Sequence, residues 1–282
     1  MSRSVRIGVA VLLVLLAIAV TAPFLGTIDP ALIDPAARNA VPWTQGEVTT
    51  SEGETVPFTY RFGTDSLGRD IYSRVLYGAR ISLMVGAAVT VLAVGLGLVV
   101  GLLAGSIRWF DMIVMRMMDG LMAIPPILLA LALVALWGSG LWTVILAITI
   151  PEFPRVVRLV RAVTLTLSNE PYVQAAVALG VPLRRRLRRH IVPSTLPALI
   201  VQASYIAASA ILIEAILSFL GIGIPPEIPS WGNIMAEGRT LFRVYPHNIL
   251  FPGIFLSLAI LAINVMGDGL RDDLDPRLAK SI

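Results

Sequence analysis

The sequence predicts an all-α, polytopic membrane protein with six transmembrane helices, and three observations lead to this fold class. Hydrophobic residues make up 56% of the chain and charged residues only 14%, whereas soluble domains are about half apolar and a quarter charged. Several uncharged runs are as long as the roughly 20 residues that cross a bilayer as a helix. Arginines gather between alternate runs, as expected of a chain that crosses the membrane repeatedly.

The spans are predicted from the uncharged runs in chain order. They cover residues 7–25, 81–107, 114–137, 141–160, 194–219 and 248–267. The third and fourth come from one stretch that is too long for a single span. We divide it at Gly138-Ser139-Gly140, a sequence typical of turns.

The first segment has a second interpretation. Its basic start, its apolar run and the small residues Ala17-Ile18-Ala19 also resemble a signal peptide. Removal of a leader would leave five spans, with the chain ends on opposite sides of the membrane. The run is long for a leader, so we favour a span.

The distribution of arginine orients the spans. With a cytoplasmic N-terminus, most of the 22 basic residues fall in cytoplasmic segments, including five arginines within residues 184–189. The positive-inside rule therefore predicts that both termini are cytoplasmic, which an even number of spans allows.

The chain divides into a first span, residues 1–25, an external segment, residues 26–80, and a core with five spans, residues 81–282. We expect little regular structure up to about Tyr60, because the segment is rich in polar and turn-forming residues. A short amphipathic helix is predicted from Asp70 into the second span. In the last external loop, residues 221–247, the aromatic side chains Trp231, Phe242 and Tyr245 suit the membrane interface.

The cytoplasmic segment between the fourth and fifth spans is the most unusual part. Arg155, Arg158 and Arg161 share one helix face, which suits anchoring to lipid headgroups. Ser168-Asn169-Glu170-Pro171 then predicts the start of a helix, which Gly180 ends. This helix is too short to be stable alone, so it must pack against the spans or against a partner.

The sequence carries no recognisable catalytic chemistry. It has no cysteine, and its two histidines are far apart. The only lysine is Lys280, and it does not follow the glycines of a P-loop, the Gly-x-x-x-x-Gly-Lys-[Ser/Thr] motif that binds nucleotide phosphates. We therefore expect no cofactor on this chain and no enzymatic activity, and any P-loop energy source would be a separate subunit.

Glu214 interrupts an otherwise apolar span. A carboxylate at membrane depth is costly, so it should face a polar partner or a cavity. Two interpretations stay open: a structural hydrogen bond, to Asn264 or Ser209, and a place on the translocation pathway. A proton relay is a third, although a relay would use several such groups.

Residues 172–193 read YVQAAVALGVPLRRRLRRHIVP. This stretch resembles the EAA loop of ATP-binding-cassette (ABC) importer permeases, with Gln174 in the position of the glutamate and Val192 where leucine is common. Three further stretches, at 62–83, 217–235 and 266–278, resemble the C-type permease of dipeptide and oligopeptide importers. The resemblance covers residues 62–278 and the first span.

The resemblance implies a type I importer permease in a bacterial inner membrane, with a coupling loop over residues 166–193. The short helix would sit in a groove of an ATPase subunit and transmit its motion to the spans. The residues implied in this coupling are Tyr172, Gln174, Ala175, Ala176, Gly180, Ile191 and Pro193. The implied partners are a homologous permease, two ATPase subunits and an extracytoplasmic binding protein, and no nucleic acid.

Peptides are the implied substrate, while glutathione, opine-like compounds and nickel chelates are alternatives within the same family. An ion-coupled transporter would favour more carboxylates at membrane depth than Glu214. A membrane-embedded enzyme would need a catalytic constellation, and we find none in the sequence.

Overall fold

The computed structural model describes residues 2–49 and 55–274. Most of these residues are helical, and the elements follow in this order: α1 Arg3–Thr21, η1 Ala22–Phe24, η2 Pro35–Ala37, β1 Thr44–Thr49, β2 Thr55–Tyr60, α2 Ile71–Ser106, α3 Arg108–Met122, α4 Pro126–Trp137, α5 Leu141–Ser168, α6 Pro171–Ala178, α7 Leu183–Arg186, η3 Leu187–Ile191, α8 Val192–Phe219, α9 Trp231–Gly238 and α10 His247–Leu274. The last part of the motif at 266–278, and with it Arg277, lies outside the described residues, as does Lys280.

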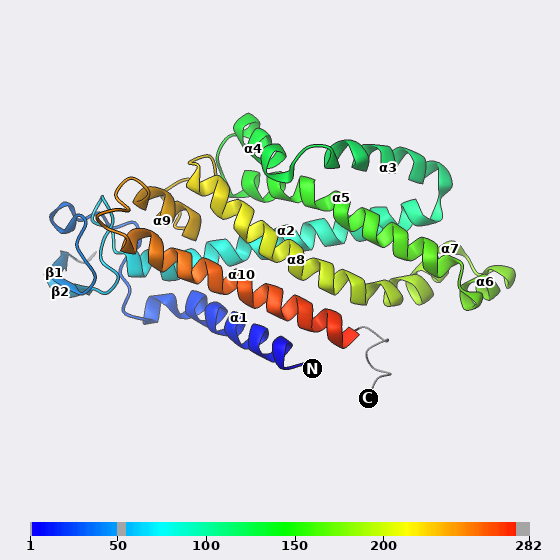
Figure 1. Cartoon of the computed structure of the whole chain (residues 1–282), viewed down its shortest axis with the longest axis horizontal. Coiled ribbons are helices and arrows are strands. Elements are labelled where there is room, and N and C mark those ends of the chain that lie inside the picture. Colours follow the sequence, from blue (N-terminus) through cyan, green and yellow to red (C-terminus); the bar gives the residue numbers. More distant parts are fainter. Residues whose placement is uncertain (1, 50–54, 275–282) are drawn as a thin grey trace.

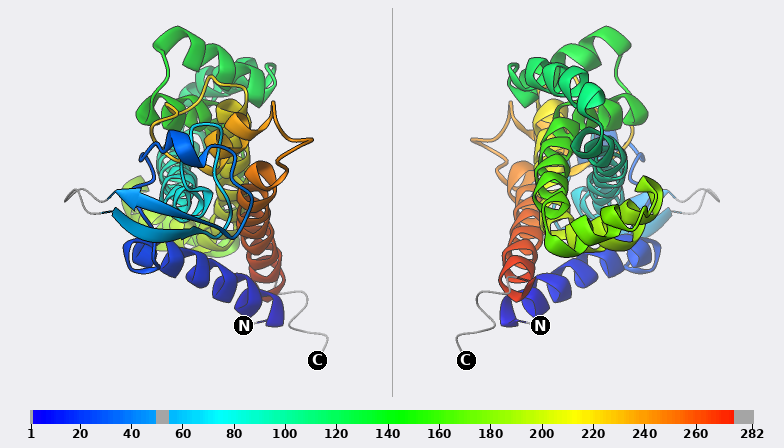
Figure 2. Two further views of the ribbon diagram at one scale, coloured as in Figure 1. Left: turned by 90° about the vertical axis from the view of Figure 1, so that its left-hand side faces the viewer. Right: turned by 90° about the vertical axis from the view of Figure 1, so that its right-hand side faces the viewer.

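Five long helices, α1, α2, α5, α8 and α10, run lengthwise through the molecule (Figure 1). The strands and α9 lie at one end, which we call the hairpin end. The short helix α6 projects from the other end, which we call the α6 end. Seen end-on, α3 and α4 cover one side of the bundle, and α1 and α10 lie on the opposite side (Figure 2).

Glycines allow α2 and α5 to pack closely along the bundle. Gly97, Gly101 and Gly105 of α2 face Val156, Val160 and Thr164 of α5, respectively. A Cβ atom on Gly101 would lie 2.6 Å from the Cβ of Val160. Because both series advance by four residues in the same direction, the two helices run parallel. Small residues at this spacing let helix backbones approach inside a membrane, where the hydrophobic effect does not drive association.

The third predicted span, residues 114–137, is not one helix. The chain breaks between Met122 and Pro126, and α3 and α4 meet at 89°. The cause is the pair Pro125-Pro126, which lacks two backbone donors and disfavours helical geometry at Ile124.

Length and hydropathy identify four membrane spans in the described chain, or five if the bent pair counts as one. They are α1 with η1, α2, the helix Leu183–Phe219 and α10. The fourth predicted span, residues 141–160, corresponds to α5, which has the length of a span but carries Glu152 and Arg155 midway.

The segment before Tyr60 was expected to be loop, and this expectation is wrong. β1 and β2 form an antiparallel hairpin in which Thr44 pairs with Tyr60 and Thr49 with Thr55. Threonines and valines favour this extended pairing, although polar residues between them obscured the pattern. The predicted helix from Asp70 is confirmed: Asp70 caps α2 by accepting from the backbone N–H of Ser73 at 2.8 Å.

The first helix packs as a span of the bundle would, along α10. Gly8 lies close to the backbone of α10, since a Cβ atom there would be 2.6 Å from the carbonyl oxygen of Ala262. The described chain ends also meet, because the backbone N–H of Ser2 donates to Asp273 at 2.8 Å. Both ends therefore lie on the same side of the bundle (Figure 1).

Candidate functional site

The predicted short helix is confirmed as α6, an eight-residue helix that lies furthest from the hairpin end (Figure 1). Pro171 occupies its first turn, where a missing backbone donor costs nothing. The residue at its N-cap is Glu170, without a side-chain bond. Ser168 and Asn169 instead finish α5, where the Asn169 amide donates to the carbonyl of Leu165 at 3.1 Å.

Gly180 ends α6 through its backbone conformation. Its φ angle is +70°, a left-handed value that favours glycine. The N–H of Gly180 donates to Val177 and the N–H of Val181 donates to Ala176, at 2.9 and 3.0 Å. This pair of bonds is a Schellman motif, which satisfies the last carbonyls of the helix and turns the chain back toward the bundle.

The faces of α6 separate the residues that the resemblance singled out. Val173 and Ala176 are buried against the rest of the chain. Tyr172 and Ala175 are exposed, and Leu179 is 82% exposed. Ala175 and Ala176 therefore face different surroundings, and only the first belongs to the free surface. Tyr172, Val177 and Leu179 together leave apolar surface exposed on this short helix, and gathered apolar surface is typical of interaction sites.

Gln174 fastens α6 to the end of α5. Its side-chain N–H donates to the carbonyl oxygen of Ser168 at 2.9 Å. An ionised glutamate in this position has no proton to donate, so glutamine makes a contact within the chain that the usual residue of the motif could not. Gln174 also lines a cavity of about 300 Å³ together with Ser106, Asn169 and Arg186.

Ile191 and Pro193 anchor the far end of the loop. Ile191 is 2% exposed and belongs to the main hydrophobic core. Pro193 is exposed and follows η3, a π-helical turn in which the N–H of Val192 donates to the carbonyl of Leu187. Pro193 has no N–H with which to continue the helical ladder, which explains why the wider turn precedes it.

Glu214 is fully buried inside the chain. Its expected partners, Asn264 and Ser209, are wrong. The hydroxyl of Ser218 donates to it at 2.8 Å, and that of Ser82 lies 3.5 Å away. The carboxyl group therefore bridges α8 and α2. Its place on a translocation pathway stays a prediction.

A second buried carboxylate, Glu152 of α5, was missed. It is fully buried and accepts hydrogen bonds from Arg155 at 3.0 Å and from Ser209 at 3.0 Å, which ties α5 to α8. It lies within the predicted span 141–160, but Pro151 and Pro154 interrupt the end of that span, so it was not recognised as a carboxylate at membrane depth. The structure continues the helix through both prolines to Ser168.

The three arginines expected to anchor lipid headgroups form ion pairs within the chain instead. Arg158 pairs with Asp119 of α3, and Arg161 pairs with Asp111 of the same helix. Arg155 pairs with Glu152. Arg158 and Arg161 thus hold α3 against α5, and their acidic partners lie 39 and 50 residues away in sequence.

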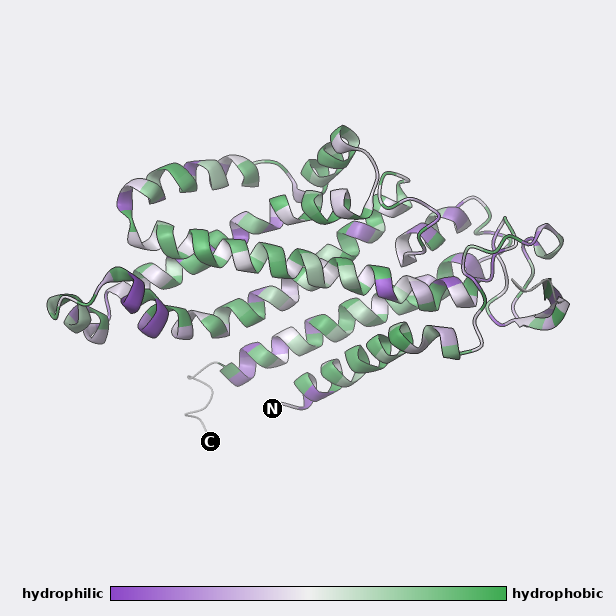
Figure 3. Ribbon diagram, turned by 180° about the vertical axis from the view of Figure 1, so that it is seen from behind, coloured by the Kyte–Doolittle hydropathy of each residue, from purple (hydrophilic) through white to green (hydrophobic). Residues whose placement is uncertain are grey.

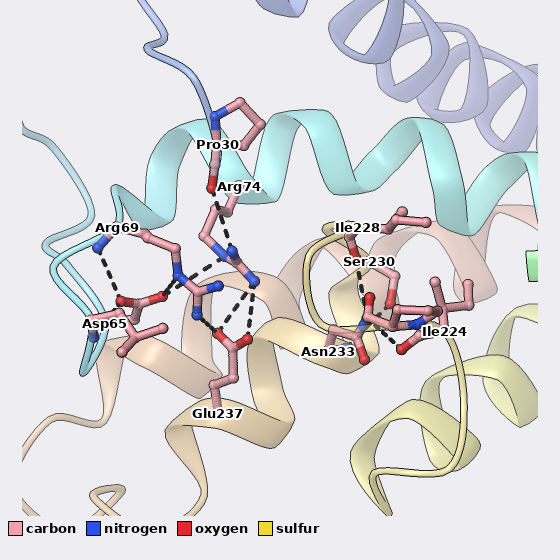
Figure 4. A network of polar contacts seen from close by, with 11 residues as sticks. Pro30, Asp65, Arg69, Arg74, Ile224, Ile228, Ser230, Asn233 and Glu237 are labelled. Carbon is pink, nitrogen blue, oxygen red and sulfur yellow. Dashed lines mark hydrogen bonds and ion pairs between the residues drawn. The ribbon is translucent and has the colours of Figure 1, made fainter. Parts of the chain in front are cut away.

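A buried ionic network at the hairpin end ties the start of α2 and the loop before it to α9 (Figure 4). Asp65 accepts from Arg69 at 2.7 Å, and Glu237 of α9 pairs with both Arg69 and Arg74. Arg74 is fully buried and also donates to the carbonyl of Pro30 at 3.3 Å. Burial raises the pKa of Glu237, whereas the two guanidinium groups lower it.

A side chain of α9 also holds the loop that precedes this helix. The side-chain amide of Asn233 donates to the carbonyls of Ile224, Pro225 and Ile228, at 3.0 to 3.1 Å. Trp231, expected at the membrane interface, is fully buried, and its indole N–H donates to Val75 at 3.1 Å. Within residues 2–49 and 55–274, no group of three or more His, Cys, Asp or Glu side chains could hold a metal ion.

The sequence matches a family of transport proteins. Residues 93–280 match the model of the binding-protein-dependent transport system inner membrane component. The chain belongs to this family of membrane permeases. The permease is 52% identical to a probable peptide ABC transporter permease of Sinorhizobium fredii, over 77% of this chain and 74% of that protein. It is 44% identical to a putative peptide transport system permease of Brucella suis, over 98% and 88%.

Another relative is a dipeptide transport system permease of Alkalihalophilus pseudofirmus, 43% identical over 77% of this chain and 72% of that protein. Solved structures support the fold. The permease resembles a chain of the inward-facing MetNI methionine ABC transporter with a TM-score of 0.58 and 17% identity, over 72% of this chain and 96% of that one. It resembles a chain of an amino acid ABC transporter with a TM-score of 0.55 and 14% identity, over 71% and 94%. The type I permease fold inferred from the loop is confirmed.

Proposed function

We propose that this permease forms, with a homologous second permease, the pathway of an ABC importer for di- or oligopeptides. The observation that carries the proposal is α6, a capped helix at the tip of the molecule with Tyr172, Ala175 and Leu179 on its free face. It has the form of a coupling helix that fits a groove on an ATPase. Peptides are the substrate class named in several relatives.

The α6 end is then cytoplasmic, and the hairpin end faces the binding protein. The arginine-rich residues 184–189 lie at the α6 end, as the positive-inside rule requires. The meeting of the described chain ends agrees with two cytoplasmic termini. ATP and its magnesium ion would bind to two partner ATPase subunits, which drive alternating access through the loop 166–193.

Ion-coupled transport is the competing function. The sequence argued against ion coupling because Glu214 was the one carboxylate expected at membrane depth, and the buried Glu152 removes that argument. We favour an ABC importer because of the family match.

The test is purification of the tagged permease with the products of its neighbouring genes, followed by ATP hydrolysis assays with and without the candidate binding protein. We expect a second permease and ATPase subunits to copurify, and the peptide-loaded binding protein to stimulate hydrolysis. A permease that purifies alone under gentle extraction would contradict the importer. Stimulation only by a non-peptide ligand would retain the importer and reject peptides.

A further inference from the structure

The helix that follows α6 begins with a basic face. Arg184, Arg185, Arg188 and Arg189 are exposed. Their separations of one and four residues place them on one side of the helix. The opposite side carries Leu187 and Ile191, which pack into the main hydrophobic core. The start of this helix is therefore amphipathic, with an arginine surface that faces away from the bundle.

These four arginines make no ion pair within residues 2–49 and 55–274. The arginines of the α5 face differ, since Arg155, Arg158 and Arg161 each pair with an acid of the chain. Four neighbouring cations repel one another unless anions are near. The described residues supply anions to the α5 face and none to this one, which leaves the basic face open to an anionic partner.

The position of the basic face fits the surface of a bilayer. The helix Leu183–Phe219 is continuous over 37 residues, so it is about 55 Å long, against about 30 Å for the hydrocarbon layer. Its first turns therefore extend into the headgroup region. Leu196 and Ile200, further along, are 46% and 45% exposed. In Figure 3 hydrophilic turns at this end give way to hydrophobic turns along α8, the order in which headgroups give way to acyl chains.

We propose that Arg184, Arg185, Arg188 and Arg189 bind the headgroups of anionic phospholipids and thereby hold the base of the α6 loop at the bilayer surface. The proposal rests on the proposed function only in placing the α6 end at a membrane surface. An acidic surface of the ATPase is the competing partner. The order of the elements favours lipid, because the arginines lie on the helix that continues into the membrane, whereas α6 carries the free apolar surface.

The test measures binding of phosphatidylglycerol and of phosphatidylcholine to the full chain in neutral detergent, by native mass spectrometry. The variants are R184Q/R188Q and R185Q/R189Q. The control is R239Q/R243Q, which removes two arginines at the same spacing from the hairpin end. Each arginine near an anionic surface contributes about fivefold in affinity, so we expect each pair to lower phosphatidylglycerol affinity about 25-fold. The control should bind normally.

Two further measurements make the result decisive. R184K/R188K should keep the affinity for phosphatidylglycerol, because lysine preserves the charge, and thermal unfolding checks that every variant is folded. Unchanged phosphatidylglycerol binding by the folded glutamine variants would overturn the proposal. If those variants instead lose the copurifying ATPase in lipid-free detergent, the basic face belongs to the ATPase interface. Failure of the wild-type chain to retain any ATPase would contradict the importer, while the lipid measurement would still report on the arginines.

Discussion

The two ends of the bundle differ in whether their charged side chains form ion pairs within the described chain. At the hairpin end, Asp65, Arg69, Arg74 and Glu237 are largely buried and neutralise one another. At the α6 end, the arginines of residues 184–189 make no ion pair within the described chain, and Leu179 is almost fully exposed. The charges of the first end are paired within the described chain, whereas the second end leaves arginines and an apolar side chain exposed. Substitutions at the first should therefore change stability, and those at the second should change coupling or binding.

The largest effect is expected for Arg74→Met. Removal of this buried cation leaves Asp65 and Glu237 to share Arg69 as their one cation, and breaking a buried ion pair costs about 3–5 kcal/mol. Thermal unfolding of the purified chain measures the loss. Arg243→Met, at an exposed arginine of the same end, is the control. Equal melting temperatures for the two variants would show that the network does not hold the hairpin end together.

The connection between the two ends is tested by Gly101→Ala. The added methyl group would lie 2.6 Å from Val160, and such overpacking costs about 1–3 kcal/mol. Gly95→Ala is a matched control on the same helix, because nothing lies within 4 Å of its new Cβ atom. We expect a lower melting temperature only for Gly101→Ala. A similar loss for both would assign the effect to α2 itself rather than to its contact with α5.

For Glu214, truncation and neutralisation should differ. Glu214→Ala leaves the hydroxyls of Ser82 and Ser218 without their acceptor, at a cost of about 1–3 kcal/mol. Glu214→Gln keeps an acceptor and should preserve both folding and transport. Peptide uptake by the reconstituted importer separates the two roles. Loss of uptake by a stably folded Glu214→Gln variant would place the charge on the pathway.

At the α6 end, Gly180→Val should affect coupling more than folding. The space around Gly180 is open, so the cost arises from the left-handed backbone and amounts to about 1–2 kcal/mol. The variant should insert and bind its partners, yet couple ATP hydrolysis to uptake poorly. Gly180→Asn is the control, since asparagine tolerates this conformation. Normal uptake by the valine variant would argue against α6 as the coupling helix.

The smallest effect is expected for the ion pair between Arg158 and Asp119. Both side chains are about half exposed, and exposed pairs contribute about 0–1 kcal/mol. A double-mutant cycle with Arg158→Gln and Asp119→Asn measures the coupling energy by thermal unfolding. A coupling energy above that range would mean that this pair contributes more to the contact between α3 and α5 than exposed ion pairs usually do.

Local signals in the sequence were sufficient for much of the fold. Asp70 acts through a side-chain cap on the helix that follows it, and Gly180 acts through its left-handed backbone conformation. Both effects are local, so the start of α2 and the end of α6 were predictable. The break before Pro126 and the series Gly97, Gly101 and Gly105 were also visible in the sequence but were overlooked. Both have a local cause that could have been recognised.

The polar contacts could not be predicted, because they join residues far apart in the chain. Nothing near Arg161 indicates Asp111, and nothing near Arg74 indicates Glu237. Trp231 was expected at the membrane interface because a tryptophan, with an apolar ring and one N–H donor, suits both an interfacial site and a buried site with a hydrogen-bond acceptor. The partner of a polar side chain and the burial of a tryptophan depend on which helices become neighbours. No local pattern in a single sequence specifies those neighbours.

The parallel packing of α2 and α5 has a mechanical consequence. α2 begins beside the ionic network of the hairpin end, and α5 leads directly into α6. The close contacts at the glycines leave little room for one helix to tilt against the other, so α2 and α5 should move as one rigid unit about 50 Å long. Motion of α6 would then be transmitted along α5 and α2 to the hairpin end, so that the two ends of the bundle would move together.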